Sequence, residues 1–182
     1  DISLAPMALG ALTKGVTPLE MVGAYQIFAN GGTFTTPYCY ERVEDANGRV
    51  ILEPDTTKKR VISEDTSVVM NKLLQSVVNA APGTGQAANL GGVMPTAGKT
   101  GTSEHDVNQW FIGITPYYVC QVWMGYDEET RKNEYGNWVP NTIRYYSYPP
   151  PILWKSIMAP LQEGLEYKQF PESDSVVSKQ FC

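Results

Sequence analysis

Basic residues, histidine, cysteine and long apolar runs are all scarce in this 182-residue sequence. Lys and Arg together number 14 against 19 Asp and Glu, which leaves a net charge of −5 at pH 7. Nucleic-acid binding requires clustered positive side chains, so this charge balance argues against a nucleic-acid partner. The apolar runs are far shorter than the roughly 20 residues that span a bilayer, and we therefore expect any membrane anchor or export signal to lie outside this chain.

Patterns for metal binding and for multiple disulfides are also missing. Cys39, Cys120 and Cys182 are odd in number and form no Cys-x-x-Cys pair, so they indicate neither a dense disulfide framework nor a zinc site, while one bridge stays open. The single histidine, His105, lies between two acidic residues and has no second histidine or cysteine at ligand spacing. We therefore predict no metal and no cofactor, and we interpret His105 as a polar loop residue.

The remaining composition is typical of a globular protein with many turns. Hydrophobic residues make up 42% of the chain, and 16 Gly, 13 Pro and 11 Tyr favour strands joined by tight turns. We expect one folded unit over residues 1–164, followed by a tail over residues 165–182 whose weak pattern is typical of a mobile segment. Residues 1–11 form a Pro-interrupted apolar segment that is typical of the inside of a larger fold.

The clearest helix signal lies near the start of the chain. Thr17 and Glu20 form a capping box in which Pro18 takes the first helical position. The sequence Asn30-Gly31-Gly32 then supplies a left-handed stop. These signals predict a helix over residues 18–30.

Two further helices follow from N-cap and apolar patterns. Ser63 is the N-cap of a helix that we expect to end near Ala80. Its predicted apolar stripe consists of Val69, Met70, Leu73, Leu74, Val77 and Val78. Another helix is predicted over residues 152–164, kinked or cut by Pro160.

Strand signals predict a peripheral hairpin and a central sheet. The hairpin spans residues 37–54 and turns at Asp45-Ala46-Asn47-Gly48. Residues 127–151 are interpreted as a polar, aromatic loop. The three central strands are predicted at residues 96–102, 110–115 and 119–126. The fold class that we predict is α/β (α+β), with an antiparallel sheet flanked by helices.

The stretch with the clearest chemical meaning runs from Ala97 to Ser103, and two chemistries compete for its Gly98-Lys99-Thr100 core. A phosphate-binding loop needs a glycine five residues before Gly98, where this sequence has Val93. Such a loop also opens directly into a helix, whereas the residues after Thr100 lead through a polar loop to a predicted strand. We therefore reject the nucleotide-binding interpretation.

The competing interpretation is the Lys-Thr-Gly element of serine penicillin-recognising enzymes, in which a strand edge lines the active site. Lys99 supplies positive charge, and the hydroxyls of Thr100 and Thr102 can bind a carboxylate. Gly101 lets a substrate approach the backbone without a clashing side chain. The predicted strand is the context that this chemistry requires.

Seven segments extend this match far beyond three residues. In chain order they are Val16–Met21 with Ala24-Tyr25, Phe28–Gly32, Arg60–Ser63, Gly83–Ala88, Ala97–Thr102, Trp110–Pro116 and Val122–Asp127. By their order and spacing the chain, over about residues 4–127, resembles the second half of the transpeptidase domain of class A penicillin-binding proteins. The resemblance implies an incomplete β-lactamase/transpeptidase-like fold.

The resemblance also implies roles for the residues of the Lys-Thr-Gly strand. The amide of Thr102 would form an oxyanion hole together with the amide of the nucleophile. Lys99, Thr100 and Thr102 would bind the carboxylate of a β-lactam or of the equivalent stem peptide. Gly101 and Ser103 complete the expected substrate-binding strand.

The sequence departs from the family at the nucleophile, because it contains neither Ser-x-x-Lys nor Ser-x-Asn. We therefore predict that this chain alone is inactive. Thr56-Thr57-Lys58-Lys59 has related spacing but lies in a charged loop, and we interpret it as surface. Tyr135-Gly136-Asn137 follows Lys99 where the family motif precedes it, so we interpret it as a chance match.

One further group of side chains has two interpretations. Trp138, Tyr145, Tyr146 and Tyr148 either line a glycan or peptide groove or, as is more common, cap the edge of a core.

Two functions stay open at this stage. The first is a fragment of a peptidoglycan D,D-transpeptidase whose intact parent binds penicillin and cross-links stem peptides at the outer face of the cytoplasmic membrane. The second is a non-catalytic binding or structural module that keeps half of the fold. The expected partners are the remaining half of the domain, a stem peptide or β-lactam, and further copies of the chain that associate through exposed faces.

Overall fold

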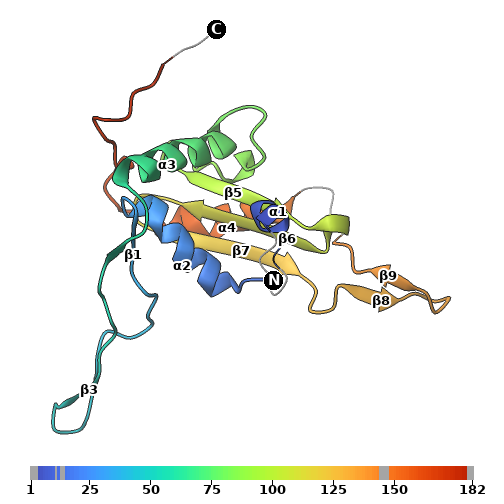
Figure 1. The fold of residues 1–182 in the computed structure, drawn as a ribbon, viewed down its shortest axis with the longest axis horizontal. Coiled ribbons are helices and arrows are strands. Elements are labelled where there is room, and N and C mark those ends of the chain that lie inside the picture. The colour runs from blue at the N-terminus through green and yellow to red at the C-terminus, as the bar shows by residue number, and fades with distance from the viewer. Residues whose placement is uncertain (1–3, 11, 13–14, 144–147, 180–182) are drawn as a thin grey trace.

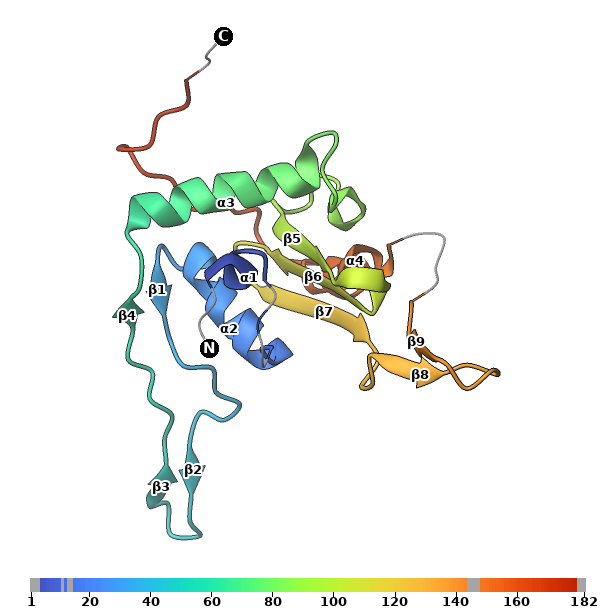
Figure 2. The ribbon, with the colours of Figure 1, turned by 45° about the vertical axis from the view of Figure 1, so that its right-hand side comes forward.

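The computed structural model describes residues 4–10, 12, 15–143 and 148–179. Its centre is an antiparallel sheet in the order β5-β6-β7 (Figures 1 and 2). The three strands are β5 (Ala97–Thr102), β6 (Asn108–Ile114) and β7 (Val119–Gly125). The predicted strands and the predicted fold class are confirmed.

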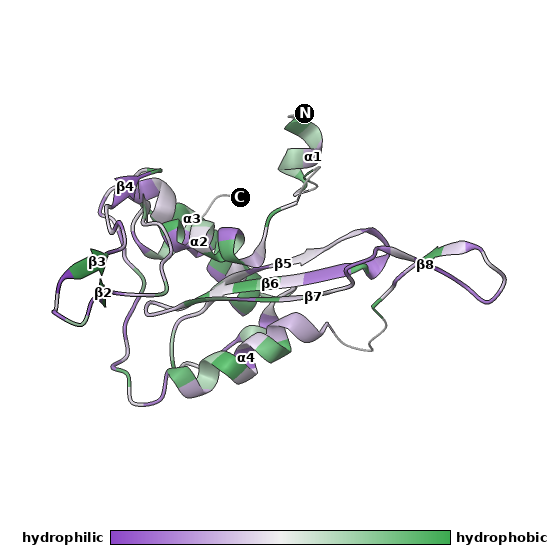
Figure 3. Cartoon of the chain, turned by 90° about the horizontal axis from the view of Figure 1, so that it is seen from below, coloured by the Kyte–Doolittle hydropathy of each residue, from purple (hydrophilic) through white to green (hydrophobic). Residues whose placement is uncertain are grey.

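Helices cover both faces of this sheet. Helices α2 (Pro18–Ala29) and α3 (Glu64–Asn79) lie on one side, and α4 (Pro149–Leu161) lies on the other (Figure 3). The short helix α1 (Leu4–Ala8) is exposed along its whole length. No helix among the described residues combines the length and the apolar character needed to cross a bilayer.

The start of α2 is fixed by the predicted capping box. Glu20 N donates to Thr17 Oγ1 at 3.2 Å, and Thr17 N donates to Glu20 Oε2 at 2.7 Å. The helix ends at Ala29 with Asn30 as its C-cap, after which Gly31 and Gly32 take positive φ angles of 60° and 87°. A side chain at Gly32 would also place its Cβ 2.3 Å from the Ile62 carbonyl oxygen, so both φ and packing require glycine here.

Helix α3 begins after Ser63 and ends before Ala80 as predicted, but its buried face differs from the predicted stripe. Val69 and Leu73 are 43% and 57% exposed. Leu74 and Val78 are buried as predicted, and the rest of the buried face consists of Ser67, Val68 and Asn71.

Hydrogen bonds to α2 explain this orientation of α3. Ser67 Oγ donates to Ile27 O at 3.0 Å, and Asn71 Nδ2 donates to Phe28 O at 3.2 Å. The last turn of a helix leaves carbonyl groups without partners inside that helix. The buried side chains of Ser67 and Asn71 in α3 donate hydrogen bonds to these carbonyl groups of α2. With this face of α3 turned toward α2, Val69 and Leu73 point outward.

Three two-stranded ribbons project from the central body. Strand β1 (Thr33–Phe34) pairs with β4 (Lys59–Arg60), and β2 (Val43–Glu44) pairs with β3 (Val50–Leu52) at the tip of the predicted hairpin. The third ribbon pairs β8 (Thr130–Lys132) with β9 (Trp138–Pro140) inside the segment that was predicted to be a loop.

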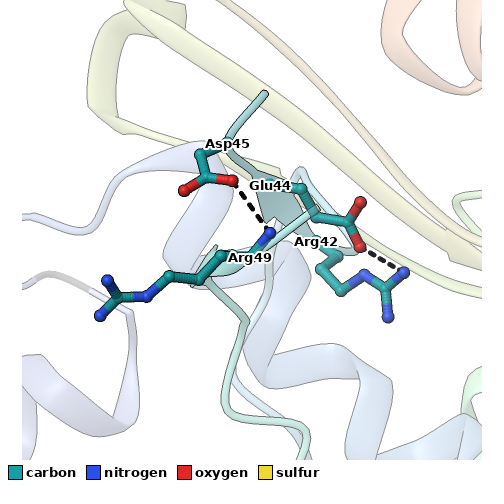
Figure 4. Close-up of polar contacts among 4 residues, drawn as sticks. All are labelled: Arg42, Glu44, Asp45 and Arg49. Atoms are coloured by element: carbon teal, nitrogen blue, oxygen red, sulfur yellow. Dashed lines mark hydrogen bonds and ion pairs between the residues drawn. The ribbon is translucent and has the colours of Figure 1, made fainter. Parts of the chain in front are cut away.

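Side chains stabilise the turn of the β2–β3 hairpin (Figure 4). Asp45 Oδ1 accepts a hydrogen bond from Arg49 N at 3.0 Å. It also accepts one from Asn47 N at 2.8 Å. Arg42 and Glu44 form an ion pair beside it. The predicted turn at residues 45–48 is therefore confirmed.

Helix α4 begins at Pro149, three residues before its predicted start at Ile152, and ends at Leu161, one residue after Pro160. Its first turn contains three consecutive prolines, and such early positions tolerate proline because their N–H groups have no partner within the helix. Trp154 of this helix is 0% exposed and packs edge-on against Phe111 of β6 at 5.6 Å between ring centroids.

The core consists of two clusters, one on each face of the sheet. The cluster under α4 contains Val78, Ala88, Leu90, Met94, Phe111, Trp154 and Met158. The cluster under α2 and α3 contains Leu74, Ala97, Ile114 and Phe170. Phe170 therefore packs the first part of the tail onto the sheet, and the mobility expected for residues 165–182 stays a prediction.

Candidate functional site

The Lys-Thr-Gly strand, β5, lies at the edge of the central sheet. Within the part of the chain that the structure describes, β5 pairs with β6 and with no other strand. Ala97 and Gly98 are buried, whereas Lys99 and Thr102 are exposed and Thr100 and Gly101 are intermediate. The C-terminal half of the strand is therefore the accessible part.

The ladder fixes the direction of each backbone group in β5. Ser103 N donates to Asn108 O at 2.9 Å, and the pair Gly101–Trp110 lies two residues further along the same ladder. Hydrogen-bonded pairs alternate in an antiparallel ladder, so Gly101 directs its N–H and C=O groups at β6. Thr100 and Thr102 direct theirs away from β6, toward the open side of the strand.

The side chains of this strand alternate between the two faces of the sheet. Lys99 and Gly101 lie on the face of α2, and Thr100 and Thr102 lie on the face of α4. Lys99 Nζ bends round the edge and donates to Thr100 O at 2.8 Å. An ammonium group and outward-pointing peptide groups therefore gather on one strand edge.

Two neighbours that the sequence did not assign contact the threonines. Thr84 Oγ1 lies 2.8 Å from Thr100 Oγ1. Thr102 Oγ1 lies 3.3 Å from Tyr148 Oη, which also donates to Gly101 O at 2.6 Å. Gly83–Ala88 was part of the resemblance and Tyr148 was part of the aromatic cluster, but sequence spacing gave no signal for either contact.

Ser103 marks the end of the strand. Its side-chain oxygen accepts a hydrogen bond from Asn108 N at 2.9 Å, so this hydroxyl supports the turn into the next strand. In that turn His105 and Asp106 have positive φ angles of 59° and 54°. His105 is exposed, and no cluster of potential metal ligands occurs among the described residues.

The remaining motif matches lie away from this edge. Thr56-Thr57-Lys58-Lys59 is exposed, and its last residue, Lys59, begins β4. Tyr135-Gly136-Asn137 forms the turn of the β8–β9 hairpin, which projects from the sheet (Figure 2). Trp138 of that hairpin is 68% exposed and has Lys132 Nζ 5.4 Å from its ring centroid, while Tyr145 and Tyr146 lie outside the described residues.

The described cysteines are not part of the strand edge. Cys39 is exposed, Cys120 is half-buried in β7, and both are free thiols. Burial raises the pKa of the Cys120 thiol, which disfavours the reactive thiolate. Cys182 lies outside the described residues.

A separate cavity of about 280 Å³ lies at the start of α2, beside the base of the β2–β3 hairpin. Its lining residues include Leu19, Pro37, Tyr38 and Asp55, and none of its lining residues belongs to β5. This cavity is therefore not part of the β5 edge.

Comparison with known proteins gives a consistent match. The model of the penicillin binding protein transpeptidase domain family matches residues 1–143. A curated relative, penicillin-binding protein 1A of Clostridium botulinum, is 40% identical over 176 residues, which are 97% of this chain and 20% of the relative. The chain therefore spans about a fifth of the length of this relative.

Solved structures agree with the family match. PonA1 of Mycobacterium tuberculosis, solved in complex with penicillin V, is 25% identical and covers 83% of this chain and 39% of its own, with a TM-score of 0.65. Penicillin-binding protein 1A of Haemophilus influenzae has a TM-score of 0.72 over 97% of this chain and 30% of its own. At 19% identity, the second likeness shows the fold alone.

Proposed function

Because the chain belongs to the penicillin-binding protein transpeptidase domain family, we propose that it is the substrate-binding part of a peptidoglycan D,D-transpeptidase. The residues assigned to the substrate are Lys99, Thr100, Gly101, Thr102 and Ser103. The open side of β5 is the observation that carries this proposal, because a cation, two hydroxyls and the outward Thr102 N–H lie on one accessible strand.

The proposed reaction of the intact parent is serine acyl transfer. A serine oxygen attacks the carbonyl carbon of the penultimate D-alanine of a stem peptide. The serine proton passes through a base to the leaving nitrogen as the C–N bond breaks, which releases the terminal D-alanine and leaves an ester. The amine of a neighbouring stem peptide then attacks the ester, forms the new amide and frees the serine.

In this proposal, β5 acts on two parts of the substrate. Thr102 N–H stabilises the negative charge that develops on the attacked carbonyl oxygen. Lys99 and the hydroxyls of Thr100 and Thr102 hold the substrate carboxylate, and each hydrogen bond to a charged group contributes about 1.5 to 3 kcal/mol. A β-lactam follows the first step, but its leaving nitrogen stays attached to the acyl group.

The nucleophile and its base belong, in this proposal, to a preceding half of the domain at the outer face of the cytoplasmic membrane. One observation favours a second candidate, a non-catalytic binding module: the 182 residues contain no Ser-x-x-Lys and no Ser-x-Asn. The two candidates differ in whether the longer protein forms an acyl-enzyme.

Labelling with a fluorescent penicillin tests the proposal. We expect no covalent adduct with this chain alone, and a stoichiometric adduct with the longer protein that includes the preceding half. In that protein Lys99→Ala is expected to slow acylation tenfold or more, and Thr102→Val to weaken substrate capture while leaving some acylation. Thr102→Pro, which removes the amide, is expected to lower the rate by about a hundredfold.

Lys72→Ala is the matched control, because Lys72 is an exposed lysine on α3. It is expected to leave the acylation rate unchanged. If Lys99→Ala and Thr102→Val both acylate at the rate of the unsubstituted protein, β5 is not the carboxylate site.

A further inference from the structure

The hydroxyl of Tyr148 lies against the peptide group whose N–H belongs to Thr102. Tyr148 Oη donates to the Gly101 carbonyl oxygen at 2.6 Å, the shortest of its contacts. The Gly101 carbonyl and the Thr102 N–H are two ends of one planar peptide unit. A hydrogen bond to the carbonyl therefore fixes the plane of that unit and polarises its N–H.

The other contacts of this hydroxyl complete a consistent network. A phenol has one proton to donate and lone pairs that accept. With its proton on Gly101 O, Tyr148 Oη accepts from Trp110 N at 3.3 Å and, as long as the Thr102 hydroxyl binds no substrate carboxylate, from Thr102 Oγ1 at 3.3 Å. Trp110 O lies 2.9 Å away and is a second acceptor for the same proton. The hydroxyl thus bridges β5 and β6 at the pair Gly101–Trp110.

Tyr148 is held by a rigid element. It is the N-cap residue of α4, and Trp154 and Met158 anchor this helix in the core with 0% and 1% exposure. Trp154 Nε1 also donates to Cys120 O of β7 at 3.0 Å. The position of the hydroxyl is therefore set by the packing of α4 against the sheet.

We infer that Tyr148 is a positioning residue that orients the Thr102 amide for the oxyanion hole, an inference that rests on the proposed function. Tyr148 binds the Gly101 carbonyl from the α4 side of the sheet, whereas the Thr102 N–H points out of the strand edge. Tyr148 therefore acts through the peptide unit and does not touch the attacked carbonyl. Its hydroxyl keeps the Thr102 N–H aimed at a fixed point when charge develops there.

Tyr148→Phe tests this role, because it deletes the hydroxyl and keeps the ring. In the longer protein that carries the nucleophile, acylation is measured over a range of penicillin concentrations to separate the affinity of the initial complex from the acylation rate constant. We expect that rate constant to fall about three- to tenfold with unchanged affinity, since the oxyanion forms only in the transition state.

Tyr117→Phe is the matched control, since Tyr117 Oη also donates to a backbone carbonyl, Glu166 O at 2.9 Å, but lies in the β6–β7 turn. It is expected to leave both parameters unchanged. An unchanged rate constant in Tyr148→Phe, or an equal loss of affinity and rate, would overturn the positioning role.

A measurement on this chain alone separates this inference from the proposed function. In the 182-residue protein, the proton chemical shift of the Thr102 amide is expected to move upfield in Tyr148→Phe and not in Tyr117→Phe, because its peptide unit loses polarisation. If the longer protein is not acylated at all, the proposed function fails, and this shift still decides whether Tyr148 orients the amide. No difference between the two variants at Thr102 overturns the inference.

Discussion

Gly98 of β5 and Gly113 of β6 lie on the α4 face of the central sheet, and Gly101 of β5 lies on the opposite face. The three positions differ in what an added side chain would meet. A Cβ at Gly113 would lie 2.4 Å from Trp154 Cε2, and one at Gly98 would lie 2.6 Å from Phe111 Cζ. At Gly101 the nearest atom is Trp110 Cβ at 3.4 Å, an ordinary van der Waals contact. Packing therefore explains Gly98 and Gly113, whereas Gly101 is explained by the proposed approach of a substrate.

Alanine substitutions distinguish these two reasons. Gly113→Ala is expected to lower the free energy of unfolding by about 1 to 3 kcal/mol, because the added methyl group meets a ring that is itself fully buried. Gly101→Ala is expected to change it by less than about 0.5 kcal/mol, yet to slow acylation in the longer protein. Urea unfolding measures the first effect and penicillin labelling the second. Equal destabilisation by both substitutions would contradict this assignment.

Side chains satisfy backbone groups at both ends of helix α2, in addition to the backbone hydrogen bond from Gly32 N to Ile27 O at 2.7 Å. Thr17 and Glu20 satisfy groups at its first turn, and Ser67 and Asn71 of α3 satisfy carbonyls at its last turn. The hydrogen bonds from Ser67 and Asn71 fix how α3 packs against the end of α2. Both helices contact the central sheet, so the same contacts place the helices beside β5 and β7.

The capping box makes the stability of α2 depend on pH. The pKa of Glu20 lies below its ordinary value near 4.5, because its carboxylate accepts hydrogen bonds from Thr17. The bond from the Thr17 backbone N–H has the larger effect, and the bond from the Thr17 hydroxyl adds to it. A lowered folded-state pKa means that the stabilisation is present above pH 4.5 and is lost as the pH falls through the folded-state pKa. We expect Glu20→Gln to reduce the fall in melting temperature over that acidic range.

Carboxyl NMR titration of Glu20 checks the cause of this effect. The pKa is expected to rise toward its ordinary value in Thr17→Ala, which removes the side-chain hydrogen bond. A titration near the ordinary value in the unsubstituted protein would contradict the capping-box explanation.

Several large apolar side chains on the helices are exposed and take no part in the described core. Leu4 of α1, Leu19 of α2 and Leu73 of α3 are 71%, 65% and 57% exposed. Where exposed apolar side chains form a contiguous patch, the patch marks an interaction surface. We propose that the remaining half of the transpeptidase domain covers these side chains in the longer protein.

We expect this chain alone to self-associate through α3, because Val69 and Leu73 lie one turn apart on its outer face. The double substitution of Val69 and Leu73 to lysine is expected to reduce the concentration dependence of the sedimentation coefficient. Ile51→Lys is the control, since Ile51 is 65% exposed on the distant β2–β3 hairpin. Equal behaviour of the two variants would show that α3 is not the contact surface.

Local signals in the sequence located both ends of α2 and α3 and the three strands of the central sheet. The capping box at Thr17, the N-cap at Ser63 and the turn before Val119 act within a few residues, so reading the chain alone locates them. The Lys-Thr-Gly strand is also a local signal, because residues 97–102 alone predict both its chemistry and its extended conformation. The placement of that strand at the sheet edge followed from the predicted motif, and the fold confirmed it.

Packing between distant segments decided the rest. The buried face of α3 depends on carbonyls of α2, about forty residues earlier in the chain. The β8–β9 hairpin has strands of three residues without apolar alternation, so only their mutual pairing defines them. The contact between Tyr148 and Gly101 joins residues 47 positions apart. Such contacts depend on the three-dimensional approach of whole elements, and no spacing in the sequence encodes that approach.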